Sequence, residues 1–259
     1  MTVRVAMWSG PRNISTAMMR AWENRSDCTV SDEPLYAAYL AATGLPHPGR
    51  DEVIAAGETD WRRVVDGLLG PPPGGRAVWY QKHMSHHLLP GMDTGWVANL
   101  RNVFLIRDPD DVVASYLRSR AEVAPADIGL QQQARLFDET CERDGVAPPV
   151  IDAGDFLRDP GAHLRALCAW LGIAFEPSML RWPAGPRDSD GVWAPHWYAH
   201  VRASTGFDPA RPKEEGTPLS GETARVAEAC RPAYEHLHRH RLQVVGGTGF
   251  EPVTPTMSR

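Results

Sequence analysis

Residues 7–22, MWSGPRNISTAMMRAW, place an arginine and a run of small polar residues directly after a short β-rich run. Arg12 has a guanidinium fork that can bind two oxygens of one anion. Further donors are the backbone N–H groups at the start of a helix, which here belong to Asn13, Ile14, Ser15 and Thr16. The side chains of Ser15 and Thr16 add two hydroxyls. The stretch lacks G-x-x-x-x-G-K-[ST], which disfavours a Mg-ATP site. It predicts an anion-binding loop, with an ordinary strand and capped helix as the alternative.

A second stretch, RNVFLIRDPDDVVASYLRSR at residues 101–120, repeats the combination of an arginine and a hydroxyl. Arg107 ends a predicted strand, and Ser115 lies eight residues later on the helix that follows. From these two places both side chains can reach one phosphate group. The alternative is a salt bridge between Arg107 and Asp108 or Asp111 on a solvated surface.

These side chains can meet only if the elements that carry them share one sheet. Apolar runs predict five strands, at residues 3–8, 28–33, 77–83, 102–108 and 148–156, with helical patterns between most of them. Helices are expected over residues 15–24, with Ser15 or Thr16 as the cap, from Pro109, and over residues 222–241. Alternating strands and helices indicate an α/β fold with a parallel sheet, whose ligands bind at the carboxyl ends of the strands.

Composition limits the class of protein. The chain has 259 residues, of which 42% are hydrophobic and 23% charged, so it can bury a sizeable core. A net charge of −5 means that an anion site must be local, and we expect no nucleic-acid partner. No run reaches the ~18 apolar residues of a membrane span. Four scattered cysteines without a C-x-x-C pair indicate reduced thiols and a cytoplasmic location.

Three ordered segments resemble one known family, the sulfotransferases that use 3′-phosphoadenosine 5′-phosphosulfate (PAPS). They are WSGPRNIST, IRDPDDVVAS and DFLRDPGAHLRALCAWLGIAFEPSMLRW, and the resemblance covers roughly residues 3–182. It implies a three-layer sandwich around a parallel sheet, the P-loop NTPase-like sulfotransferase fold. It also implies that the first segment holds the 5′-phosphosulfate and that the second, through Arg107 and Ser115, holds the 3′-phosphate.

The segments SDEPLY and YQKHMSHH are similar to a lesser-characterised bacterial-type group of sulfotransferase-like proteins, some of which are fused to aminotransferase-like domains. We expect no such second domain within these residues: one sulfotransferase domain over 1–243 and a disordered tail over 244–259. The predicted reaction moves a sulfuryl group from PAPS to a hydroxyl of a small molecule or sugar, without a metal. The acceptor and the oligomeric state stay open.

The resemblance also suggests the catalytic residues. Glu33, a glutamate followed by proline at the end of a strand, is the expected base, with Asp32 able to exchange roles with it. Lys82 is expected to steady the leaving phosphate or a sulfuryl oxygen. His83 is the rival base, but neighbouring side chains on a strand point to opposite faces, so it should face away when Lys82 faces the site. Each residue also has a structural alternative. Glu33 could be an N-cap or first-turn acid that stabilises the following helix, and Lys82 could be a surface lysine.

Some weaker candidates lie later in the chain. An acceptor pocket with aromatic walls could include Trp182, Trp193 and Trp197. Lys213 and Gly216 could stand in for a late phosphate-binding loop. A zinc site at His196 and His200 is rejected because no H-E-x-x-H pattern accompanies them. Three other functions remain possible: a small-molecule or nucleoside kinase, a nucleotide-binding protein of the same fold without catalysis, and an interaction protein that keeps only the fold.

Overall fold

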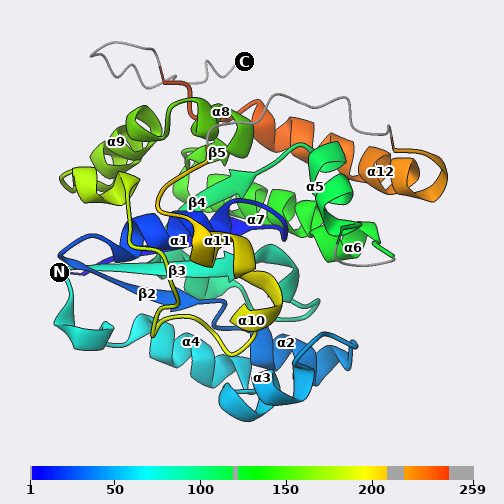
Figure 1. The fold of residues 1–259 in the computed structure, drawn as a ribbon, viewed down its shortest axis with the longest axis horizontal. Helices are drawn as coiled ribbons and strands as arrows, with labels where there is room; N and C mark the ends of the chain where they lie inside the picture. The colour runs from blue at the N-terminus through cyan, green and yellow to red at the C-terminus, as the bar shows by residue number, and fades with distance from the viewer. Residues whose placement is uncertain (1, 119–121, 209–218, 245–259) are drawn as a thin grey trace.

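The computed structural model describes residues 2–118, 122–208 and 219–244 (Figure 1). Its strands form one parallel sheet in the order β2-β3-β1-β4-β5. Their bounds are β1 (Val3–Ser9), β2 (Cys28–Asp32), β3 (Val78–Met84), β4 (Arg101–Ile106) and β5 (Val150–Asp152). All five predicted strands are therefore present, and the predicted parallel α/β sheet is confirmed.

Helices fill the connections between the strands and cover both faces of the sheet (Figure 1). The α-helices are α1 (Ser15–Glu23), α2 (Tyr36–Thr43), α3 (Arg50–Ala56), α4 (Trp61–Leu69), α5 (Pro109–Tyr116), α6 (Pro125–Ile128), α7 (Leu130–Asp144), α8 (Ala153–Arg158), α9 (Pro160–Leu171), α10 (Ala194–Trp197), α11 (Ala199–Ala203) and α12 (Gly221–His238). Short 3₁₀ turns are η1 (Pro73–Gly75), η2 (Ser85–His87), η3 (Gly95–Asn99) and η4 (Pro177–Leu180).

Two apolar layers enclose the sheet, which gives the three-layer arrangement. On one face α1, α8 and α9 pack against side chains such as Val5, Met7 and Leu105. On the other face α4, α5, α7 and α12 pack against side chains such as Trp8 and Phe104. Successive residues of each strand thus alternate between the two layers, as the pleat requires. None of the described helices is both long and apolar enough to cross a lipid bilayer.

Two predicted helix ends differ from the structure. Helix α1 begins after Ile14, and neither Ser15 nor Thr16 caps it; instead the Asn13 side chain accepts a hydrogen bond from the Ile14 N–H at 2.9 Å. Helix α12 ends at His238, three residues early, because Arg241 leaves the helix to pair with Val150 beside β5. The predicted tail falls almost wholly on residues 245–259, which lie outside the described residues. Lys213 and Gly216 also lie outside the described residues.

Candidate active site

The loop between β1 and α1 is fastened to the neighbouring strand. The Asn13 side chain donates to the Leu105 carbonyl of β4 at 3.0 Å, while its oxygen engages the Ile14 N–H. The N–H groups of the first turn of α1, from Ser15 and Thr16, have no acceptor within the helix and belong to its positive end. Arg12 has a left-handed backbone, with φ of 57°. Protein contacts therefore hold the loop that is predicted to bind an anion, and the Ile14 N–H already has a partner within it.

The two arginine-hydroxyl stretches meet at the carboxyl ends of β1 and β4. Arg12 Nε donates to Ser115 Oγ at 3.2 Å, and an Arg107 terminal nitrogen donates to the Arg12 carbonyl at 3.0 Å. Arg107 is only loosely paired with Asp111, at 3.9 Å. Asp108 instead accepts from the Asp110 N–H and so caps α5. The structure thus joins two segments that lie about a hundred residues apart.

Positive charge accumulates here. Burial lowers the pKa of the Arg12 guanidinium from its usual value, and the nearby charges of Arg118 and Arg107 lower it further. Burial is also the main cause that lowers the pKa of Arg107. The charge of Arg118 lowers this pKa further, while the carboxylate of Asp111 opposes the shift. Arginine stays charged in proteins even so. Arginines that repel one another beside a helix start suit a ligand with several negative charges.

A second group lies at the ends of β2 and β3. Lys82 Nζ lies 2.8 Å from Asp32 Oδ1, 2.6 Å from Glu33 Oε1 and 2.8 Å from Tyr198 Oη. The Glu33 N–H extends the strand ladder by donating to the Lys82 carbonyl at 2.9 Å, and its φ of 43° turns the chain immediately afterwards. Lys82 has a side chain only 1% exposed, so it is not a surface lysine.

Burial controls the charges of this group. It would lower the pKa of Lys82, but the carboxylates of Asp32 and Glu33 raise that pKa well above its usual value. Burial raises the pKa of Glu33, and the charge of Lys82 offsets part of this rise. Lys82 is therefore a permanent cation, and Glu33 is a stronger proton acceptor than an exposed glutamate.

His83 lies on the opposite face of β3 from Lys82, as strand alternation predicts. It stacks on Trp8 with ring centroids 4.4 Å apart, and its Nε2 lies 3.2 Å from Gln81 Oε1. Complete burial lowers the pKa of His83 to about 3. The imidazole belongs to the apolar layer beneath the sheet.

Both groups open onto one cleft of about 1420 Å³. Every residue predicted for the site lines it, namely Arg12, Asn13, Ile14, Ser15, Thr16, Glu33, Lys82, Arg107 and Ser115. Sequence reasoning gave no role to other lining residues, which include Tyr36, His47, His87, Arg118, Tyr198 and Arg231. The anion loop and the carboxylate–lysine group therefore share one ligand-sized space.

Of the three candidate tryptophans, Trp197 lines the cleft. Trp182 is buried against Phe207 in the layer beneath α1, with ring centroids 5.0 Å apart. Trp193 packs edge-on against Tyr36, at 5.1 Å between centroids, and forms core between α2 and α10. Two of the three thus support the fold rather than face a ligand.

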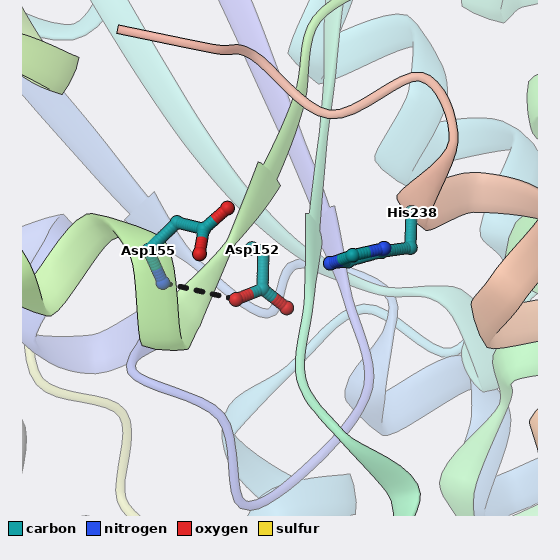
Figure 2. A group of neighbouring side chains, drawn as sticks. All are labelled: Asp152, Asp155 and His238. Carbon is teal, nitrogen blue, oxygen red and sulfur yellow. Dashed lines mark hydrogen bonds between the residues drawn. The ribbon is translucent and has the colours of Figure 1, made fainter.

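One group of described side chains has metal-like spacing; its three residues are not among those that line the cleft, although Ala153 and Gly154 between Asp152 and Asp155 are. Figure 2 shows Asp152 at the end of β5 between Asp155 of α8 and His238 of α12. Asp152 already accepts from the Asp155 N–H and the Tyr234 hydroxyl, each at 3.0 Å. Asp155 pairs with Arg241 at 2.9 Å and also with Arg158. These protein donors satisfy the carboxylates, so the group fits a structural role and not an ion.

The sequence matches the sulfotransferase domain family over residues 3–239. The chain belongs to that family. This sulfotransferase domain is 36% identical over 254 residues to branched-chain-amino-acid aminotransferase-like protein 2 of Arabidopsis thaliana, covering 96% of this chain and 44% of that protein. It covers 41% of a second curated relative. The chain thus spans less than half the length of both of these relatives.

Solved structures show the same fold. A sulfotransferase from Alicyclobacillus acidocaldarius superposes with a TM-score of 0.53 at 12% identity, over 94% of this chain and 98% of that one. The mouse sulfotransferase SULT7A1 complexed with PAP gives a TM-score of 0.50 at 12% identity, over 91% and 90%. The predicted P-loop-like sulfotransferase fold is confirmed.

Proposed function

We propose that this domain transfers the sulfuryl group of PAPS to a hydroxyl of a small molecule or sugar. The observation that supports this most strongly is the convergence of Arg12, Arg107 and Ser115 on the cleft that also contains Glu33 and Lys82. A purely nucleotide-binding protein would not need the carboxylate–lysine pair to line that cleft.

The donor fits the cationic end of the cleft by charge. In our proposal Arg12 and the start of α1, at Ser15 and Thr16, hold the 5′-phosphosulfate, while Arg107 and Ser115 hold the 3′-phosphate. These are the positions at which guanidinium groups and helix N–H groups favour oxyanions. The solved relative complexed with PAP supports a donor of this class.

The chemical step needs one proton acceptor and stabilisation of negative charge. The acceptor oxygen forms a bond to sulfur while the bond from sulfur to the 5′-phosphate oxygen breaks in line, and the hydroxyl proton passes to Glu33. The products are a sulfate ester and adenosine 3′,5′-bisphosphate. Arg12 and Lys82 supply fixed positive charge on the leaving side, in the way that a cation does in kinases.

Two measurements test the proposal. Radiolabelled PAPS is incubated with the protein and a panel of alcohols, phenols and sugars, and sulfate esters are counted. Calorimetry then compares adenosine 3′,5′-bisphosphate with Mg-ATP. We expect transfer to at least one acceptor and tighter binding of the bisphosphate. Preferential binding of Mg-ATP with phosphate transfer would identify a kinase and refute the proposal.

The cytoplasmic location and the single domain over residues 1–243 stay predictions.

A further inference from the structure

The hydroxyl of Tyr198 has a full set of partners at the carboxylate–lysine group. Tyr198 lies between α10 and α11 and is 4% exposed. Its Oη is 2.7 and 2.9 Å from the two Asp32 oxygens, and it accepts from Lys82 Nζ at 2.8 Å and from Trp193 Nε1 at 3.2 Å. A phenol has one donor and two acceptor sites, and all are used.

These contacts separate two neighbouring carboxylates. Asp32, with a side chain 2% exposed, accepts from Lys82 and Tyr198 and lies 3.4 Å from the Gly191 N–H. Glu33 is 13% exposed and lines the cleft, and Lys82 is its hydrogen-bond partner among the described side chains. Asp32 is therefore committed to the protein, whereas Glu33 can release its one contact and meet a ligand.

Tyr198 is itself held firmly, because the preceding loop is pinned to α1. The Asp190 carboxylate, 3% exposed, pairs with the buried guanidinium of Arg20 on α1 and, at 3.1 Å, with Arg202 on α11. Burial and the charge of Asp32 raise the pKa of Tyr198 well above its usual value, so the hydroxyl keeps its proton for Asp32. The loop thus delivers a permanent hydrogen-bond donor to the ends of β2 and β3.

We propose that Tyr198 is a positioning residue: its hydroxyl fixes Asp32 as the permanent counter-ion of Lys82 and so leaves Glu33 as the carboxylate that meets the acceptor. This rests on the proposed sulfuryl transfer. It also distinguishes the two adjacent acids, since Asp32 is 2% exposed, accepts from protein donors and is not among the residues that line the cleft, whereas Glu33 is.

A double-mutant cycle tests the inference. Tyr198→Phe keeps the ring and removes the hydroxyl; we expect kcat to fall roughly 10- to 100-fold, as small misplacements of reacting groups do. The Kd for adenosine 3′,5′-bisphosphate should stay unchanged. In an Asp32→Asn background the same change should cost less than about twofold, because the residue through which Tyr198 acts is already altered. Trp193→Phe removes another bond to Oη and should give a smaller loss of kcat.

Tyr234→Phe is the matched control, since it also removes a tyrosine hydroxyl from a buried aspartate, Asp152 at 3.0 Å. It should lower the unfolding temperature as Tyr198→Phe does and leave kcat unchanged. Equal kcat losses in the two variants, or an undiminished Tyr198→Phe effect in the Asp32→Asn background, would overturn the inference.

A readout without turnover separates the two proposals. Nitrogen-15 NMR of Lys82 should show ammonium hydrogens that exchange faster with water in Tyr198→Phe than in the wild type, and unchanged exchange in Tyr234→Phe. If the wild type transfers no sulfate but Lys82 responds in this way, the proposed function fails and the positioning by Tyr198 stands. If Lys82 exchange is unaffected, the positioning is wrong whatever the activity.

Discussion

Arg107 provides the sharpest test of the donor site, because it is predicted to recognise one phosphate of the nucleotide. Replacing Arg107 by alanine removes a charge-assisted bond to the 3′-phosphate, worth about 1.5–3 kcal/mol. The side chain is 30% exposed, which favours the low half of that range, or about a 10- to 40-fold loss for adenosine 3′,5′-bisphosphate. AMP lacks the 3′-phosphate and should lose only about threefold, from the missing bond to the Arg12 carbonyl.

The assay is calorimetric titration of both nucleotides into the wild type, Arg107→Ala and Ser115→Ala. Arg143→Ala serves as the control, because this arginine pairs with Asp144 on the far end of α7 and does not line the cleft. Its affinities should equal those of the wild type. If Arg107→Ala weakens AMP as much as the bisphosphate, the arginine only orders the loop, and the assignment of the 3′-phosphate to this stretch is refuted.

Four further predictions concern the cleft and strand β3. Glu33→Gln should lower kcat by roughly 10²–10⁴ while the bisphosphate Kd is unchanged, and wild-type kcat should fall as pH drops through the raised pKa of Glu33, because the base must be deprotonated. Lys82→Met leaves two carboxylates without their buried cation, so chemical denaturation should show about 3–5 kcal/mol less stability. His83→Ala should retain turnover. The pKa of His83 in the folded protein is about 3, below its value in the unfolded chain, so the stability of the wild type should decline as pH falls from about 6.5. This decline in stability should be less steep in His83→Ala. Activity should survive EDTA, whereas its loss would indicate a metal.

The sheet and most of the site could be predicted because their signals are local. Each strand is a short apolar run, and the candidate site residues Arg107 and Glu33 come directly after the ends of β4 and β2. In a parallel sheet these ends share one edge, so placing the strands also placed the side chains. Strand alternation likewise predicts that Lys82 and His83 lie on opposite faces of the sheet, as they do.

Tyr198 could not be found in this way. It lies 166 residues after Asp32, in a loop-rich segment with no periodicity, and only the tertiary path brings the two together. The same holds for Arg20 and Asp190, 170 residues apart, which anchor that path. Trp182 and Trp193 show the reverse difficulty, since an aromatic residue in a loop has the same sequence signal whether it faces core or ligand.

Among the described non-glycine residues, Arg12 and Glu33 are the two with a positive φ angle, and both line the cleft. A left-handed backbone costs a residue with a side chain about 1 kcal/mol or more, and glycine carries no such penalty. At Glu33 this relief is outweighed, because glycine would remove one of the two carboxylates that pair with the buried Lys82. At Arg12 no such ion pair opposes the change, so a laboratory selection for heat resistance alone would favour glycine there and remove the anion fork. Thermostabilised versions of this domain should therefore be tested for nucleotide binding as well as for stability.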